Sequence, residues 1–555
     1  MTDRSIAAHS PVPESRTIGV LMCAMLGFAL LSGQVVWLAL KGQGTHRLSM
    51  SEPIARNFAR PDIVDRHGRL IATDLEAPSL FADPAVVLDV DEVAEKLGTI
   101  FPDIDQLQLR LQLSDKSRRF VWLRRGLSPR VAQRIHDLGL PGLGFRREQK
   151  RSYPLGRLAG HILGAVNVDN RGLSGVEKFI DETVGIEAVL GAKPSAKVPI
   201  QLSLDIGVQY GLEDELAAAV QRYTAAGAAG IVMDATNGEI IAAASLPNID
   251  PAHPAQALEP ARLDKIQSGT FELGSIFKLL TVAQALDSKA ATADTVIDVR
   301  APLWIGRHQI RDLHPAGRPL SVRDIFVQSS NVGAARLALE AGADRQRAFL
   351  KLSGILKQGS TEAGPIAAPS LPKNWGEVET ATIAFGHGLA TSPLRFTAAA
   401  ASLLNGGTLV EPTVLRANIA PRPQGDRIIA AETSASLASL MRRNVTLPTG
   451  TGRRAEVPGY EVGGKTGTAE IAIEGKYRGN MVISSFLATF PASQPRYIIL
   501  VLLDRPQPSA DSGGQITAGT NAAPTAGRII ARVGPLLQGK AAEELTLFDA
   551  IPNAK

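Results

Sequence analysis

The sequence predicts an α+β protein with a single N-terminal transmembrane helix, and three observations support that fold class. An uncharged apolar stretch runs from Ile18 to Leu40, near the start of the 555-residue chain. The segment 228–251 holds two apolar runs around Asn237-Gly238, a dipeptide typical of a tight β-hairpin. From there to about residue 537, strand-like runs alternate with Ala/Leu-rich runs of helical spacing.

The apolar stretch contains 23 residues and is bounded by Arg16 and Lys41. As a helix it would be roughly 34 Å long, which is enough to cross a bilayer. A cleaved signal peptide would have a shorter apolar core of about 7–15 residues, so we predict a retained anchor at residues 17–41. Residues 1–16 are then a short cytoplasmic tail, although the flanking positive charges alone favour the opposite orientation.

Composition excludes several classes of function. Lys and Arg number 59 against 54 Asp and Glu, and no basic block tracks a phosphate backbone, so we expect no nucleic-acid binding. The single cysteine, Cys23, lies in the apolar stretch and leaves no disulfide or CxxC metal site. The nine histidines lack metal-ligand spacing, so we expect no metal and no cofactor.

Residues 42–195 are predicted to form an elongated, mixed α/β pedestal domain. The segment 60–74 has the pattern of a strand, a His-Gly turn and a second strand. Segments 91–98 and 129–138 have the apolar spacing of helices instead. This half shows no acid and base in a pattern that points to catalysis.

A domain boundary is predicted at Pro194, which stands close to two lysines. Apolar residues then alternate through 198–205 as in a strand and recur at helical spacing through 208–220. We therefore assign 198–539 to a second, larger domain and 540–555 to a short, loose C-terminal tail.

The segment FELGSIFK places Ser275 and Lys278 at the start of a helix predicted over 276–285. Residues three apart lie on one helix face, so the two side chains can meet. A serine hydroxyl needs a base to become a nucleophile, and a desolvated lysine can be neutral enough to serve. SxxK arises by chance in most long chains, so this motif alone is a weak signal.

The segment QSSNVG contains Ser329 and Asn331, a hydroxyl two residues before an amide. Such a pair can relay a proton while the amide anchors a substrate carbonyl or amine. The simpler interpretation is a helix N-cap or a turn, which serine and asparagine both favour.

The segment GGKTGTAE admits two interpretations. Residues 459–466 match GxxxxGK[ST], the phosphate loop of nucleotide hydrolases, and the apolar run 497–504 ends in an aspartate that suits magnesium. A phosphate loop must follow a buried strand and open into a helix. Here a polar, proline-interrupted stretch precedes the glycine, and two-residue alternation follows it, which disfavours a P-loop NTPase.

The alternative is an edge strand that carries Lys465, Thr466 and Thr468. Alternation places the two threonines on one side of such a strand. Their hydroxyls and the lysine ammonium suit a substrate carboxylate, and backbone N–H groups at the edge can stabilise an oxyanion.

SxxK, SxN and KTG in this order resemble the penicillin-binding protein and serine β-lactamase superfamily, which implies an antiparallel sheet flanked by helices. Further segments resemble class B penicillin-binding proteins, and SSNVG with FGHG resembles the division-specific FtsI type. Leu273 and Ile276 depart from the usual framework residues, and we interpret His387 of FGHG as structural. The other supporting segments are RPDIVDRHGRLIA, RSYPLGRLAGH, GLSGVE, LLNGG and the 228–251 hairpin.

The resemblance implies a peptidoglycan D,D-transpeptidase that cross-links stem pentapeptides of lipid-linked precursor strands through a serine acyl-enzyme and is acylated by β-lactams. It also implies a role for each motif residue. Ser275 attacks the carbonyl carbon of the substrate, and Lys278 takes the proton of its hydroxyl. Ser329 passes a proton to the leaving amine, and Asn331 holds Lys278 and the substrate amide. The terminal carboxylate is bound by Lys465, Thr466, Gly467 and Thr468, and the oxyanion hole is formed by the N–H groups of Ser275 and Thr468.

The same resemblance implies an inner-membrane protein with a periplasmic catalytic domain and a cytoplasmic N-terminus, acting at the septum. Its expected partners are a SEDS-family glycosyltransferase of the FtsW type and other divisome proteins. The alternatives that remain are an elongation-type class B enzyme, a β-lactamase and a β-lactam-binding sensor or scaffold. A β-lactamase is disfavoured because it would normally be a smaller, secreted domain without the anchor and pedestal.

Overall fold

A computed structural model describes residues 59–189, 198–416, 425–473 and 476–549, together with scattered positions between 22 and 34. The chain divides into two compact units, Met1–Asn57 and Phe58–Lys555, and the elements below all belong to the second unit. The predicted anchor at 17–41 lies mostly outside the described residues, and the predicted tail at 1–16 lies entirely outside them. Within the described positions, no helix combines the length and apolar character needed to cross a membrane.

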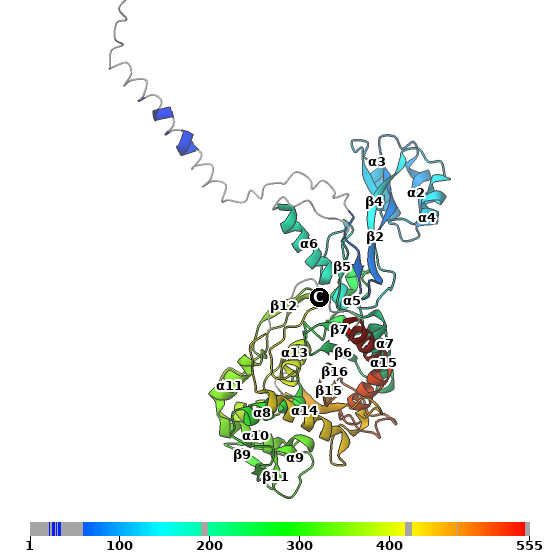
Figure 1. Ribbon diagram of the computed structural model, residues 1–555. Helices are drawn as coiled ribbons and strands as arrows, with labels where there is room; N and C mark the ends of the chain where they lie inside the picture. Colours follow the sequence, from blue (N-terminus) through cyan, green and yellow to red (C-terminus); the bar gives the residue numbers. More distant parts are fainter. Residues whose placement is uncertain are drawn as a thin grey trace, which may run out of the picture. The chain divides into compact units, whose positions relative to one another are not determined.

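The predicted pedestal contributes four strands to a five-stranded sheet and contains a lobe of helices (Figure 1). The first two strands pair antiparallel with Ile63 opposite Ala72, which confirms the strand, turn and strand predicted over 60–74. Two of the helices confirm those predicted over 91–98 and 129–138. The elements are β1 (Ile63–Val64), β2 (Leu70–Ala82), α2 (Val90–Ile100), α3 (Gln106–Ser114), β3 (Val121–Arg124), α4 (Pro129–His136), β4 (Leu143–Ser152), α5 (Gly160–Leu163) and α6 (Gly175–Val189).

The fifth strand of this sheet, β5 (Ile200–Gln201), pairs parallel with β1. It is shorter than the alternation through 198–205 predicted; Leu202, which follows it, still donates to Val64 O at 2.9 Å but forms an isolated bridge with Leu415. Residues assigned by sequence to the second domain thus complete the sheet of the first.

A buried cluster of charged side chains ties the pedestal elements together. Glu177 of α6 accepts hydrogen bonds from Arg60 Nε at 3.0 Å and from Arg151 Nε of β4 at 2.6 Å. Asp74 of β2 accepts from Arg151 Nη1 at 3.1 Å. The four side chains are at most 6% exposed, and each positive charge faces a negative one. Burial on this scale is tolerated because the charges are paired and hydrogen-bonded.

The larger domain is built on a five-stranded antiparallel sheet with the order β14-β15-β16-β6-β7. The predicted hairpin around Asn237-Gly238 is confirmed, with Ile231 opposite Ala243. The strand that carries the Lys-Thr-Gly segment lies at the sheet edge, as one of the two interpretations predicted. The strands are β6 (Gly227–Asp234), β7 (Ile240–Leu246), β14 (Gly463–Ile473), β15 (Lys476–Phe490) and β16 (Tyr497–Asp504).

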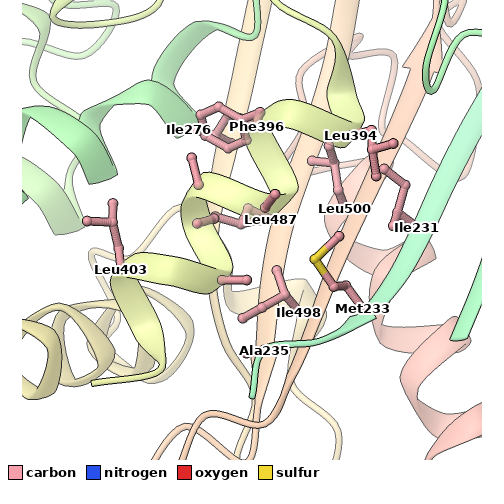
Figure 2. Close-up of a cluster of buried hydrophobic side chains, with 14 of the residues drawn as sticks. Ile231, Met233, Ala235, Ile276, Leu394, Phe396, Leu403, Leu487, Ile498 and Leu500 are labelled. Carbon is pink, nitrogen blue, oxygen red and sulfur yellow. The ribbon is translucent and has the colours of Figure 1, made fainter. Parts of the chain in front are cut away.

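Helices cover both faces of this sheet (Figure 1). On one face, α13 (Pro393–Leu404) packs against the strands, where Leu394 lies beside Leu500 and Ile231 (Figure 2). The opposite face packs against α7 (Ile206–Arg222) and α15 (Ala522–Asp549). Successive strand residues point to opposite faces of the sheet. Because both faces are covered by helices, every residue of β16 is buried, and its sequence is one nearly continuous apolar run.

The C-terminal helix differs from the sequence prediction of a loose tail at 540–555. Helix α15 continues to Asp549, so the predicted boundary at residue 539 falls inside it. Its apolar side chains pack against the sheet up to Leu537, which is where the apolar pattern ends. The segment that follows is rich in Ala, Glu and Leu, whose high helix propensity favours continuation of the helix.

The remaining elements complete the larger domain. They are η1 (Pro254–Leu258), η2 (Pro260–Arg262), η3 (Gly274–Phe277), α8 (Lys278–Asp287), β8 (Val296–Ile297), β9 (Leu303–Ile305), β10 (His308–Ile310), β11 (Leu320–Ser321), α9 (Val322–Val327), α10 (Asn331–Ala341), α11 (Ala343–Leu352), β12 (Gly359–Thr361), β13 (Gly364–Ile366), α12 (Glu377–Ile383), α14 (Ala431–Thr446) and η5 (Arg453–Ala455).

Candidate active site

Ser275 and Lys278 meet at the junction of η3 and α8. Ser275 lies in the 3₁₀ turn, where side chains three residues apart eclipse one another, and Lys278 opens the helix. The Nζ atom of Lys278 lies 2.7 Å from the Oγ atom of Ser275. Lys278 is fully buried, whereas Ser275 is half-buried and open to a ligand. The serine thus has a base in hydrogen-bonding contact.

The surroundings of Lys278 favour its neutral form. Burial lowers the pKa of Lys278 to about 7, and the carboxylate of Asp312 opposes that shift only in part. Its Nζ atom also lies 2.7 Å from Asn331 Oδ1 and 3.0 Å from the carbonyl oxygen of Ser329. At neutral pH a large fraction of this amine can accept a proton.

The segment between α9 and α10 turns Ser329 towards this lysine. Ser329 adopts a left-handed φ of 63°, a conformation that costs free energy in a residue with a side chain. Its neighbour Ser330 is the N-cap of α10 and accepts a hydrogen bond from Gly333 N at 3.0 Å. The segment thus contains the helix cap that the simpler interpretation predicted, while Ser329 and Asn331 face Lys278.

Lys465 reaches the same serine from β14. Its Nζ atom is fully buried and donates to Ser329 Oγ at 2.8 Å, and Lys278 Nζ lies 3.3 Å from that oxygen. Burial and the charge of Lys278 together hold the pKa of Lys465 well below its usual range. One hydroxyl thus bridges two buried amines that disfavour carrying charge at the same time.

The rest of the Lys-Thr-Gly segment shapes the wall beside Ser275. Thr466 Oγ1 lies 2.6 Å from Thr451 Oγ1, and Thr468 Oγ1 accepts from Ala518 N at 3.1 Å. A Cβ atom at Gly467 would lie 2.4 Å from the carbonyl oxygen of Leu273, so only glycine lets the serine turn approach the strand. The segment is a strand throughout, which excludes the phosphate-loop interpretation.

Asp312 is a site residue that the sequence analysis missed. Its carboxylate accepts hydrogen bonds from Ser330 Oγ at 2.7 Å and from the backbone N–H groups of Asn331 and Val332. A carboxylate at a helix N-terminus compensates the partial positive charge there, so Asp312 fixes the turn that carries Ser329. No periodicity marks the loop before β11, and only its capping partners reveal this residue.

His387 packs between Phe385 and Tyr477, with ring centroids 5.3 Å and 5.9 Å away. Burial and the nearby charge of Lys278 lower the pKa of His387 to about 4, so the imidazole is neutral at pH 7. Its packing between two rings agrees with the predicted structural role.

The described residues offer no metal centre. No group of three or more His, Cys, Asp or Glu side chains in this part of the chain could hold an ion. The expectation that the protein needs no cofactor stays a prediction.

An accessible serine paired with a buried lysine, beside the Lys-Thr-Gly edge strand of an antiparallel sheet, defines the class of active-serine acyl-transfer enzymes. The family model described as "Penicillin binding protein transpeptidase domain" matches residues 228–531. A second, "Penicillin-binding Protein dimerisation domain", matches residues 56–185. The chain therefore belongs to the penicillin-binding protein family, as the sequence motifs predicted.

Two curated relatives support the assignment. The chain is 37% identical to the "Probable peptidoglycan D,D-transpeptidase FtsI" of Caulobacter vibrioides, with 100% of this chain and 94% of the relative covered. It is 33% identical to the "Probable peptidoglycan D,D-transpeptidase PenA" of Neisseria meningitidis serogroup A, covering 90% and 88%. A crystal structure of penicillin-binding protein 3 from Mycobacterium tuberculosis, complexed with aztreonam, shares the fold at a TM-score of 0.65 and 24% identity, covering 87% and 97%.

Proposed function

We propose that this chain is a peptidoglycan D,D-transpeptidase that works through an acyl-enzyme on Ser275. The observation that carries the proposal is the 2.7 Å contact between Ser275 Oγ and the fully buried Nζ of Lys278. Ser275 attacks the carbonyl of the penultimate D-Ala of a stem pentapeptide and releases the terminal D-Ala. An amino group of a neighbouring stem then takes the acyl group and forms the cross-link.

Lys278 takes the proton of Ser275 as the C–O bond forms. A pKa of about 7 places the base close to the working pH, where general-base catalysis is most effective. Asn331, whose Oδ1 lies 2.7 Å from Lys278 Nζ, holds the amine in place. Its Nδ2 donates one hydrogen bond to Arg311 O at 3.2 Å, and we assign its second N–H to the substrate amide. The hydroxyl of Ser329 passes a proton to the departing amine, since it contacts Lys278 and Lys465 alike.

Lys465, Thr466, Gly467 and Thr468 receive the terminal carboxylate of the donor stem. A bound carboxylate would supply the counter-charge that Lys465 lacks and would restore its protonated form. The backbone N–H groups of Ser275 and Thr468 are assigned to the oxyanion hole, where donors stabilise the charge that develops on the carbonyl oxygen. β-Lactams acylate the same serine because they mimic D-Ala-D-Ala.

We assign the enzyme to the division septum, because a relative of full-length coverage is named FtsI. The anchor at 17–41 would hold it in the inner membrane as a single-pass protein, with residues 1–16 in the cytoplasm and the catalytic domain in the periplasm. That orientation follows from the location of the substrate, lipid-linked peptidoglycan strands. A SEDS glycosyltransferase of the FtsW type and other divisome proteins are its proposed partners.

Covalent labelling of the full chain with a fluorescent penicillin tests the acyl-enzyme. The wild type should be labelled, and Ser275→Ala should abolish the label. Ser288→Ala removes an exposed hydroxyl just after the same helix and should leave labelling intact. Failure of the wild type to label, or a label that survives Ser275→Ala, would refute the proposal.

Depletion of the protein in its host tests the septal assignment. Filamentous cells would support a role in division. Rounded cells would instead assign the enzyme to elongation.

A further inference from the structure

The active site has an anionic side for which the steps above assign no role. Glu272 lies three residues before Ser275 and is half-buried. Its carboxylate accepts hydrogen bonds from Gly388 N at 2.9 Å and from the Tyr477 hydroxyl at 3.2 Å. Among the described residues no lysine or arginine pairs with it, so its negative charge lacks a counter-ion.

A second carboxylate adds to this charge. Burial and the charges of Glu272 and Glu470 raise the pKa of Tyr477 to about 12. Glu470 lies on β14, two residues beyond Thr468, and is exposed. Tyr477 is 48% exposed, so the region around its hydroxyl is open to a ligand from solvent.

Comparison with Glu411 shows what Glu272 lacks. Glu411 is also half-buried, but it pairs with Lys357 at 2.7 Å and Arg395 at 3.0 Å, and those cations lower its pKa. Burial raises the pKa of Glu272, because no cation compensates the cost of removing its charge from water.

The neutral ring of His387 lies between the side of the site that holds the two lysines and the side that holds Glu272. Its ring contacts Tyr477 on one side and Phe385 on the other, and Lys278 Nζ lies 5.9 Å from the centre of the Phe385 ring. Lys278 and Lys465 lie on the side that suits a carboxylate, whereas Glu272 and Glu470 mark a side that suits a cation. Transpeptidation needs both, because the donor stem ends in a carboxylate and the acceptor amine arrives protonated.

We propose that Glu272, together with Tyr477, binds the ammonium group of the acceptor stem and delivers it to the acyl-enzyme. This inference rests on the proposed function. The ammonium loses one proton, through Glu272, to solvent. The free amine attacks the ester carbon, a C–N bond forms, the bond from that carbon to Ser275 Oγ breaks, and Oγ takes the second proton from nitrogen. The products are an amide, the free serine and one released proton.

A purely structural role for Glu272 is the competing explanation, since its bond to Gly388 N steadies the FGHG loop. Glu272→Gln keeps an oxygen acceptor of the same size and removes the charge. If Glu272 is only structural, Glu272→Gln should slow the reaction equally with all acceptors. If Glu272 binds an ammonium group, the variant should lose more activity with a protonated acceptor than with a neutral one. The test therefore compares two small nucleophiles, glycinamide, which is largely protonated at neutral pH, and hydroxylamine, which is largely neutral.

The full chain is acylated with a benzoyl-D-alanyl thioester in the presence of each nucleophile, and amide, hydroxamate and free acid are quantified by mass spectrometry. In Glu272→Gln the yield of amide relative to hydroxamate should fall about 10- to 100-fold, the range for one lost charged hydrogen bond. Glu272→Asp should recover part of the preference, and Glu470→Gln should lower it less. Glu259→Gln, an exposed carboxylate paired with Arg262, is the matched control.

An unchanged ratio in Glu272→Gln, or an equal loss with both nucleophiles, would overturn the ammonium site. Tyr477→Phe provides a second test if Glu272→Gln does not fold, because it removes the hydroxyl beside the carboxylate and should lower the ratio in the same direction. Penicillin labelling of the wild type reports the acyl-enzyme separately. Failure of the proposed function would abolish that label, whereas failure of this inference would leave it intact.

Discussion

Two buried groups of charges in this chain are built on opposite principles. In the pedestal, Glu177 and Asp74 face Arg60 and Arg151, so every charge has a partner of opposite sign. In the active site, two lysines share one serine hydroxyl, and Asp312 compensates only Lys278, and that only in part. Paired charges keep their ionised forms and hold elements together, whereas unpaired like charges lose protons and become reactive. Buried charges that stabilise the fold are therefore paired with opposite charges, whereas those that act in catalysis are not fully paired.

The largest effect should come from removing the buried base. Lys278→Met is expected to slow acylation by about 10²- to 10⁴-fold, the usual contribution of a general base. The free energy of unfolding of the variant should not fall, because methionine fills a similar volume without the cost of burying an amine. Stopped-flow labelling and thermal unfolding of the full chain give the two numbers. Lys351→Met, an exposed position on α11, is the control, and a marked loss of stability in Lys278→Met would contradict the contrast.

Breaking the pedestal cluster should have the converse result. Glu177→Ala leaves two buried arginines without a shared partner and is expected to destabilise the protein by about 3–5 kcal/mol. The acylation rate of the folded fraction should stay at the wild-type value. Denaturant unfolding with parallel labelling measures both, and Glu182→Ala on the exposed side of α6 is the matched control. A loss of acylation without a loss of stability would show that the cluster is not structural.

Asp312→Asn should have a smaller effect on the acylation rate and should also shift its pH dependence. It weakens the charged cap of α10, so acylation should fall about tenfold, as for one lost charge-assisted hydrogen bond. The carboxylate raises the pKa of Lys278, so its removal should move the half-maximum of acylation to lower pH. Asp298→Asn, an exposed carboxylate paired with Arg300, should change neither. A shift to higher pH would contradict the assignment.

Local patterns predicted much of the fold. The two apolar runs around Asn237-Gly238 predicted β6 and β7, and the alternation after Gly467 distinguished an edge strand from a phosphate loop. The loose tail predicted at 540–555 does not agree with α15, which continues to Asp549 through residues of high helix propensity.

Local sequence spacing also predicted part of the candidate site. Ser275 and Lys278 are one helical turn apart, so sequence spacing implies their contact. Asp312 and Tyr477 reach the site from loops and strands distant in sequence, and their contacts exist only in the folded chain. Such residues carry no periodic signal that a single sequence could reveal.

The pH dependence of acylation decides whether the neutral amine of Lys278 activates Ser275. The second-order rate of penicillin labelling of the full chain should rise with pH through a midpoint near the Lys278 pKa of about 7. Below that midpoint it should fall roughly tenfold per pH unit, because only the neutral amine accepts the serine proton. A midpoint near 10.5, the pKa of an ordinary lysine, or a rate independent of pH, would contradict the account.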